Sequence, residues 1–229
     1  MNKHVLSAMS IAVAMVCASS AQAAYIQMDN YDVSGTTSAS TVKFQYSGSS
    51  TVNYTGGAGA FDGQFSHGKT GAFISYCVDI FQSFSWHSAF STVEKTTTEQ
   101  FGATKANAIG QLYSSRYETS LTSATNSAAF QLALWEIVND TDYSLNTGTF
   151  KAIGTSSAIL NQASLWLANL TGPGNKYNFI VYTSTSKQDQ IVATLVPPAP
   201  VPLPAALPLM ASGLGLLGYN LRRRKLQIA

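Results

Sequence analysis

The sequence predicts an α+β fold, in which a β-sandwich or barrel-like sheet carries a helical insertion. A signal peptide and a C-terminal transmembrane helix flank this domain. Short alternating apolar segments occupy much of residues 24–100, the middle of the chain has helical periodicity, and strand-like runs follow at 177–183 and 190–196. An order of strands, then helices, then strands is typical of a sheet interrupted by helices. We therefore place one folded domain at residues 24–196.

The N-terminal residues 1–23 have the three parts of a secretory signal. Lys3 gives a positive start, residues 5–18 form a short apolar stretch, and the AQA tripeptide at 21–23 is a small-x-small cleavage site. We expect the chain to be exported and its mature form to begin at Ala24. An uncleaved membrane anchor is the alternative.

The first half of the domain is expected to be mostly β. Residues 41–46 alternate, residues 51–54 can form another strand, and six glycines between 56 and 71 predict loops and turns. The clearest strand is 72–81, with residues 84–93 as its expected hairpin partner. One face of that strand is apolar and the other is mixed: Ile74, Tyr76, Val78 and Ile80 against Phe73, Ser75, Cys77, Asp79 and Phe81.

Three helices are expected in the middle of the chain. A second helix is capped by Asn126 or Ser127 and runs to about Asn139; it is apolar nearly all round, so it should be buried. The glycine-proline-glycine sequence at 172–174 should end the third helix. Helical spacing marks the first helix at Ala106, Ile109, Leu112 and Tyr113, and the third at Ile159, Ala163, Trp166, Leu167 and Leu170.

The C-terminal end changes composition abruptly. Residues 197–204 are rich in proline and predict an extended spacer, and 205–221 carry no charge, which gives a segment near the minimum length of a spanning helix. The basic tail 222–229 begins with Arg222, Arg223, Arg224 and Lys225. By the positive-inside rule this tail stays cytoplasmic, while the domain lies on the other side of the inner membrane.

This order of proline motif, apolar span and arginine cluster resembles the PEP-CTERM sorting signal of bacterial surface proteins, in its VPLPA variant. The matching residues are Val201, Pro202, Leu203, Pro204 and Ala205, and Leu203 stands where the commoner form has Glu. The resemblance implies a Gram-negative host, processing by an exosortase, and attachment to the cell surface or release into an exopolysaccharide matrix. A simple anchor that is never cut is the alternative.

The charge of the domain excludes one class of partner. Only 8 of the 13 Lys and Arg residues fall within 24–196, against all 11 Asp and Glu, which leaves a net charge near −3. The domain has no cluster of basic residues. We therefore expect no nucleic-acid partner, because nucleic-acid binding needs a basic surface.

Two residues of the domain stand out chemically. Cys17 leaves with the signal, so Cys77 is the single cysteine of the exported domain and has no partner for an intramolecular disulfide. Gln131 is the only polar residue in the run from Ala128 to Trp135, and a buried amide needs a hydrogen-bonding partner. The ordinary explanations are a packed cysteine and a glutamine that bonds a backbone carbonyl or a neighbouring strand.

Taken together, the two residues suggest a thioester. A thiolate can attack the glutamine side-chain carbonyl and expel ammonia, provided that the fold holds the two groups in near-attack contact. Apolar surroundings would keep water from the bond. A position of Gln131 near a helix N-terminus would also help, because the helix dipole favours negative charge on the amide oxygen.

The sequences around these residues resemble the thioester domains of bacterial surface adhesins. The matching segments are Tyr76-Cys77-Val78-Asp79 and Phe130-Gln131-Leu132-Ala133-Leu134-Trp135-Glu136. The resemblance implies that Cys77 and Gln131 form the cross-link. Thr is usual before the glutamine in that family, and this sequence has Phe130 there.

Three functions follow as hypotheses. The first is an adhesin or matrix cross-linker that acylates an amine or hydroxyl of a surface protein or exopolysaccharide. The second is a non-covalent structural protein of the biofilm matrix with a free Cys77. The third is a hydrolase with Cys77 as nucleophile and His67 or His87 as base, which no local signature supports. We expect a protein that is not an enzyme and has no cofactor or metal, since Asp29, Asp32 and Asp62 lack ligand-loop spacing.

Overall fold

A six-stranded barrel forms the centre of the fold. The computed structural model describes residues 23–32, 39–67 and 69–197. The barrel is closed, with the strand order β1-β4-β5-β9-β8-β6, and all neighbouring strands are antiparallel. The strands are β1 (Ala23–Tyr31), β4 (Phe61–His67), β5 (Ala72–Cys77), β6 (Phe90–Lys95), β8 (Tyr177–Thr183) and β9 (Gln190–Leu195). The barrel-like sheet predicted from the sequence is therefore confirmed.

A smaller sheet lies beside the helices. Its strand order is β3-β2-β7, with β2 at Ser40–Ser47, β3 at Thr51–Ala58 and a two-residue β7 at Phe150–Lys151. Strands β2 and β3 form a long hairpin that pairs from Ser40 opposite Ala58 to Ser47 opposite Thr51. Both strands contact α2 (Ala124–Asn139), so the small sheet covers one side of that helix.

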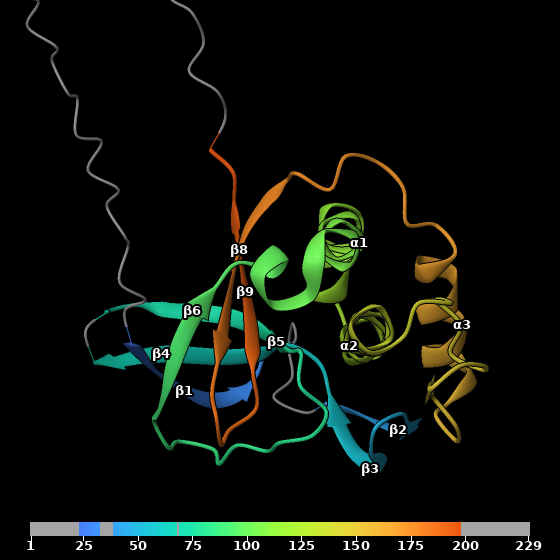
Figure 1. The fold of residues 1–229 in the computed structure, drawn as a ribbon, viewed down its shortest axis with the longest axis horizontal. Helices are drawn as coiled ribbons and strands as arrows, with labels where there is room; N and C mark the ends of the chain where they lie inside the picture. Colours follow the sequence, from blue (N-terminus) through green and yellow to red (C-terminus); the bar gives the residue numbers. More distant parts are fainter. Residues whose placement is uncertain (1–22, 33–38, 68, 198–229) are drawn as a thin grey trace, which may run out of the picture. The chain divides into compact units, whose positions relative to one another are not determined.

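Three helices form a layer next to the barrel, with α2 between the other two (Figure 1). Helix α1 (Thr97–Ser120) starts with a reciprocal capping box of Thr96 and Glu99, and α2 is capped by the Ser123 hydroxyl. Helix α3 (Ser157–Leu167) packs on α2 with its buried face. The α+β class with a helical insertion between strands is thus confirmed.

The core is rich in aromatic rings and joins the helices to the barrel. The ring of Phe130 on α2 lies 4.6 Å from that of Tyr76 on β5 and 4.9 Å from that of Tyr113 on α1. Leu134, Trp135 and Trp166 are also buried, as the apolar pattern predicts. Helix α2 is therefore held from several sides, and its position relative to β5 is fixed by packing.

Several predicted boundaries are wrong. The glycine-rich segment forms regular strands, because β3 and β4 run through it and gain their hydrogen bonds from β2, β1 and β5. At Gly63 a side chain would come within 2.6 Å of the Phe73 ring, so glycine permits close packing there. Residues 84–93 are not a hairpin partner of β5, whose neighbours are β4 and β9.

Element ends also differ from expectation. Strand β5 stops at Cys77 rather than at residue 81, because the Asp79 side chain accepts a hydrogen bond from the Phe81 N–H and turns the chain. Helix α2 begins after Ser123 rather than after Asn126 or Ser127, and α3 ends at Leu167, before Gly172. The first strand was missed as a separate element and begins at Ala23.

The terminal segments are not part of this description. Within the described residues no helix is both long enough and apolar enough to cross a membrane. The expected signal up to residue 22, the sorting motif at 201–205, the membrane helix at 205–221 and the basic cluster at 222–225 lie outside the described residues.

Candidate functional site: a buried cysteine–glutamine pair

The fold brings Cys77 and Gln131 into direct contact. Cys77 is the last residue of β5, and Gln131 lies in the middle of α2. The Cys77 N–H donates to the side-chain oxygen of Gln131 at 3.1 Å, and the side-chain nitrogen of Gln131 donates to the Cys77 carbonyl at 2.7 Å. Both residues are fully buried. The amide is thus fixed in position and orientation by two hydrogen bonds.

This contact completes the edge of a strand. Strand β4 pairs with β5 only as far as Ser75, so it leaves the next peptide groups on that side without a partner strand. The Gln131 amide bonds the N–H and carbonyl of Cys77 much as a neighbouring peptide would. A buried backbone group without a partner would cost free energy, so the interaction is also structural.

A second polar group, next to the pair, fixes α2 against the barrel. The Tyr76 hydroxyl donates to Ser120 at 2.8 Å and lies 3.1 Å from the hydroxyl of Ser127. The Ser127 hydroxyl also accepts the backbone N–H of Ala60 at 2.7 Å. These buried bonds connect β5 to the end of α1 and to the first turns of α2. By fixing α2 against β5, they keep the Gln131 side chain next to Cys77.

The thiol is in an unusual environment. The Cys77 Sγ donates to the Asp79 carbonyl at 2.8 Å. Burial raises the pKa of the thiol well above its ordinary value; the indole of Trp135 and the Asp79 backbone oppose this rise, and the charges of Asp79 and Asp189 add to it. The neutral thiol is therefore the stable form near neutral pH.

Trp135 is a buried donor beside the sulfur. It follows Gln131 by one helical turn, and its ring packs 5.1 Å from that of Phe44. Its indole N–H has no hydrogen-bond partner in the described part of the chain. Because Trp135 opposes the rise of the thiol pKa, its N–H is available to stabilise negative charge on the sulfur.

An aromatic pocket borders the pair. It has a volume of about 180 Å³, and both Gln131 and Trp135 contribute to its wall. Trp86, which is 40% exposed, contributes to its lining and lies on the outside. The other aromatic lining residues are Tyr31, Tyr54, Phe61 and Phe84. The pocket therefore reaches Gln131 between aromatic and polar side chains.

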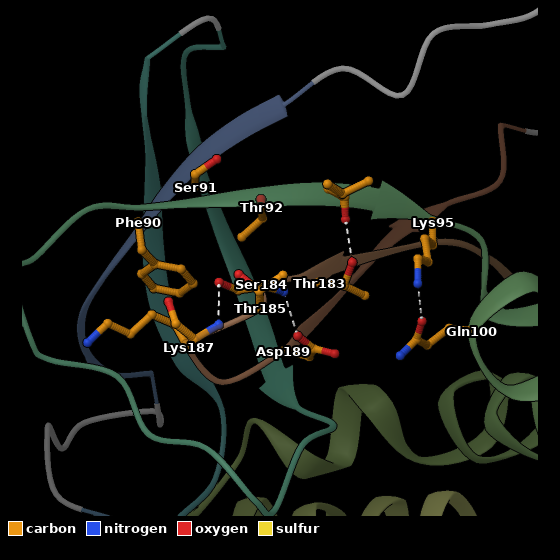
Figure 2. A pocket seen from close by; sticks show the side chains of 12 residues that line it. Phe90, Ser91, Thr92, Lys95, Gln100, Thr183, Ser184, Thr185, Lys187 and Asp189 are labelled. Carbon is orange, nitrogen blue, oxygen red and sulfur yellow. Dashed lines mark hydrogen bonds between the residues drawn. The ribbon is translucent and has the colours of Figure 1, made fainter.

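A larger hollow lies elsewhere. It has a volume of about 570 Å³ and is bordered by β6 and the segment that joins β8 to β9. Figure 2 shows hydrogen bonds there between Lys95 and Gln100, and between Ser184 and Asp189. Neither Cys77 nor Gln131 lines it. The larger hollow is therefore not the one that borders the Cys77–Gln131 pair.

The other candidate residues lie apart from the pair. His67 contacts the Ser66 hydroxyl, and His87 pairs with Asp29, so neither histidine is a side-chain partner of Cys77. Gln131 is in the middle of α2 and not near its N-terminus, so the helix dipole gives its amide oxygen little help. Sequence reasoning also missed the Cys77 N–H as the group that contacts the amide oxygen. No side-chain pattern could have revealed it, because it is a backbone group.

The fold and the site together define a class: an α+β barrel domain with a buried Cys–Gln pair, followed by a C-terminal sorting segment. Residues 200–225 match the PEP-CTERM protein-sorting motif, so the chain carries this signal. The motif supports an exported protein of the cell surface. It includes the proline motif and the basic cluster identified from the sequence.

The solved structures that match this chain include a mutant thioester domain and a pilus adhesin domain. A mutant of the N-terminal thioester domain of a surface protein from Clostridium perfringens is 10% identical, with a TM-score of 0.42; the match covers 59% of this chain and 89% of that one. The N-terminal domain of the Streptococcus pyogenes pilus tip adhesin Cpa is 14% identical, with a TM-score of 0.43, over 75% of this chain and 100% of that one. No curated protein matches the sequence significantly.

Proposed function

We propose that this protein is a surface adhesin or matrix cross-linker that forms an internal thioester between Cys77 and Gln131. The observation that carries the proposal is the pair of hydrogen bonds that clamps the Gln131 amide against Cys77 in a fully buried site. Holding two reacting groups together replaces a bimolecular encounter and lowers the entropic part of the barrier. The sorting motif supports a site of action outside the cell, where partners for attachment are present.

The bond-forming step needs no external reagent. The sulfur of Cys77 rotates from the Asp79 carbonyl and attacks the side-chain carbonyl carbon of Gln131. The C–N bond of the amide breaks, the thiol proton moves to the departing nitrogen, and ammonia leaves. Negative charge develops on the amide oxygen, which already accepts the Cys77 N–H. This backbone donor acts as an oxyanion hole.

The second step transfers the acyl group to a partner. An amine or hydroxyl attacks the thioester carbonyl, forms an amide or ester with the Gln131 side chain, and releases the Cys77 thiol. The aromatic pocket gives the attacking group a path to Gln131. Each molecule reacts once, so the protein is a reagent for attachment and not an enzyme with turnover.

The address of the protein is part of the proposal. After export to the outer face of the inner membrane of a Gram-negative bacterium, an exosortase would cut near Val201–Ala205. The segment 205–221 would hold the precursor in that membrane only transiently. The mature domain would then reach the cell surface or the exopolysaccharide matrix of a biofilm. A surface protein amine or a polysaccharide hydroxyl is the expected target.

A non-covalent matrix protein is the second candidate. It is favoured by the fact that Gln131 completes the hydrogen bonding at the end of β5, which is a sufficient structural reason for a glutamine there. In that case Cys77 is a free, buried thiol. The two candidates differ in one chemical property, which is reactivity toward amines.

Incorporation of a biotinylated alkylamine tests the proposal. We expect the wild-type protein to take up one amine, and peptide mapping to place it on Gln131. Cys77→Ala and Gln131→Ala should take up none, because each removes one half of the bond. Gln188→Ala is the matched control, since Gln188 lines the same pocket but bonds the Asp79 carbonyl instead. Absence of uptake by the wild-type protein, or equal uptake by Cys77→Ala, would reject the covalent function.

A further inference from the structure

Three carboxylates converge at the C-terminal end of α2. One oxygen from each of Glu136, Asp140 and Asp142 lies within 4.8 Å of the others. Glu136 is in the last turn of the helix, and Asp140 is its C-cap. Three acids at this separation repel one another strongly unless a proton or a metal cation lies between them. The negative end of the helix dipole adds to that repulsion.

No basic side chain neutralises this cluster. The ion pairs of the described residues involve other acids: Glu94, Asp29 and Glu118. Lys105 is the nearby basic residue that contacts this end of α2, and its ammonium donates to the Val138 carbonyl at 2.5 Å. The three carboxylates therefore lack a partner of opposite charge among the described residues.

Glu136 provides an independent observation. Its side chain is completely buried, and one oxygen accepts the Ser144 N–H at 3.1 Å. The other oxygen, Oε2, is buried and has no hydrogen-bond partner. An unpartnered carboxylate oxygen inside a protein is costly, so its position beside two more carboxylates points to a missing ligand.

The loop after α2 holds the two aspartates in place. The side chain of Asp140 accepts hydrogen bonds from the N–H groups of Thr141, Thr149 and Phe150 at 2.8, 2.5 and 3.1 Å, and from the Thr149 hydroxyl at 3.0 Å. Asp142 accepts from the Ser144 N–H at 3.0 Å and the Thr147 hydroxyl at 2.8 Å. These bonds organise the acids before any ligand binds.

The same loop needs a glycine beside the cluster. Gly148 has a φ of +77°, and a Cβ there would come within 2.1 Å of one Asp140 oxygen and 3.0 Å of an Asp142 oxygen. Any side chain would therefore press on both carboxylates. Glycine therefore lets the backbone at position 148 pass close to the carboxylates of Asp140 and Asp142.

We propose that Glu136, Asp140 and Asp142 bind a hard divalent cation of the calcium type. Carboxylate oxygens are the preferred ligands of such ions, and calcium accepts irregular sets of six to eight oxygens that include backbone carbonyls and water. The bound ion joins the end of α2 to the loop 140–149. Since α2 also carries Gln131 and Trp135, the ion fixes the helix that positions the reactive pair. The site does not depend on the thioester.

Calcium titration of the purified full chain, after chelation and dialysis, tests this site. Calorimetry should show one binding event, and calcium at 100 times its Kd should raise the melting temperature by roughly 5–10 °C. Cys77→Ala should give the same shift, which separates this result from the proposed thioester. Magnesium should give a smaller shift, because its octahedral geometry is stricter.

Three variants make the test specific. Glu136→Gln and Asp142→Asn should each abolish the calcium-induced shift while they keep the wild-type circular dichroism spectrum. Asp62→Asn, on strand β4, removes an exposed acid outside the cluster and should keep the full shift. Absence of a shift in the wild-type protein, an unchanged shift in both cluster variants, or a larger response to magnesium would overturn the assignment.

Discussion

The amide of Gln131 bonds the end of β5, and in the proposed reaction it also supplies the acyl group. It satisfies the backbone of Cys77, and the same two bonds hold its carbonyl carbon beside the cysteine. A role in stability therefore does not exclude reactivity. Burial keeps the thiol neutral, so the proposed attack on the Gln131 amide must include transfer of the thiol proton to the departing nitrogen.

The sequence could identify these two residues and, through the resemblance, their proximity, but not the hydrogen bonds between them. A lone exported cysteine and a lone polar residue on an apolar helix are visible in the chain itself. The bonds between them depend on the point where β4 stops pairing with β5, which is a property of the sheet. Glu136, Asp140 and Asp142 were overlooked, although their spacing places them at one helix end.

Phe130 stands before Gln131 where thioester domains usually have Thr, and its packing gives a reason for the difference. Its ring packs against Tyr76, Tyr113, Tyr117 and Trp166. A hydroxyl at this position would face aromatic rings and lose most of these contacts. The residue before the glutamine is therefore part of the core in this protein, on the side of α2 that faces α1 and α3.

At the residue scale, Asp189 should make stability depend on pH. Burial raises its pKa from 3.8 to about 6; the Ser184 N–H and Lys95 oppose the rise, and Asp79 adds to it. Between these two values the folded state binds the proton more tightly than the unfolded state, so this group makes stability fall as the pH rises from about 4 to 6.

Urea unfolding at several pH values measures this effect. The stability of the wild-type protein relative to Asp189→Asn should decrease across that window and then stay constant, since asparagine keeps an acceptor for Ser184 without titrating. Parallel curves for the two proteins from pH 4 to 7 would contradict the assigned shift.

Helix α2 is the element on which both proposals depend. It lies between α1 and α3 and contacts β2, β3 and β5. Its apolar sequence predicted burial correctly, because a helix that is apolar all round has no face suited to water. The partners of β5 were harder to predict from the sequence. One of them, β9, follows all three helices in the chain, so no local pattern indicates that it pairs with β5.

At the element scale, Phe130→Ala should be strongly destabilising. The substitution leaves a cavity among aromatic rings and should cost about 3–5 kcal/mol in the free energy of unfolding. Leu165→Ala is the control; Leu165 is 56% exposed on α3, and its truncation should change stability by less than about 0.5 kcal/mol. Urea denaturation measures both. A cost below about 1 kcal/mol for Phe130→Ala would show that the aromatic cluster is not a tight core.

At the scale of the whole molecule, the chain combines a compact domain with a C-terminal sorting signal. The described residues up to Val196 form one compact unit, and the sorting motif lies in the segment that follows in the sequence. The Cys77–Gln131 pair is buried where the end of β5 meets α2, and a pocket with aromatic walls borders Gln131. Such an arrangement suits the proposed function, in which the domain is exported first and its thioester reacts with a partner afterwards.

The intact mass of the exported protein tests the central claim most directly. The wild-type protein and the Cys77→Ala and Gln131→Ala variants should be recovered from the medium or surface of an exosortase-bearing host. All three share the same ends, so the two variants define the mature termini. We expect the wild-type protein to be lighter than its sequence requires between those termini by about 17 Da, the mass of the expelled ammonia. Both variants should agree with their sequences. A wild-type mass that also agrees with its sequence would contradict the thioester and leave a non-covalent matrix protein with a free Cys77.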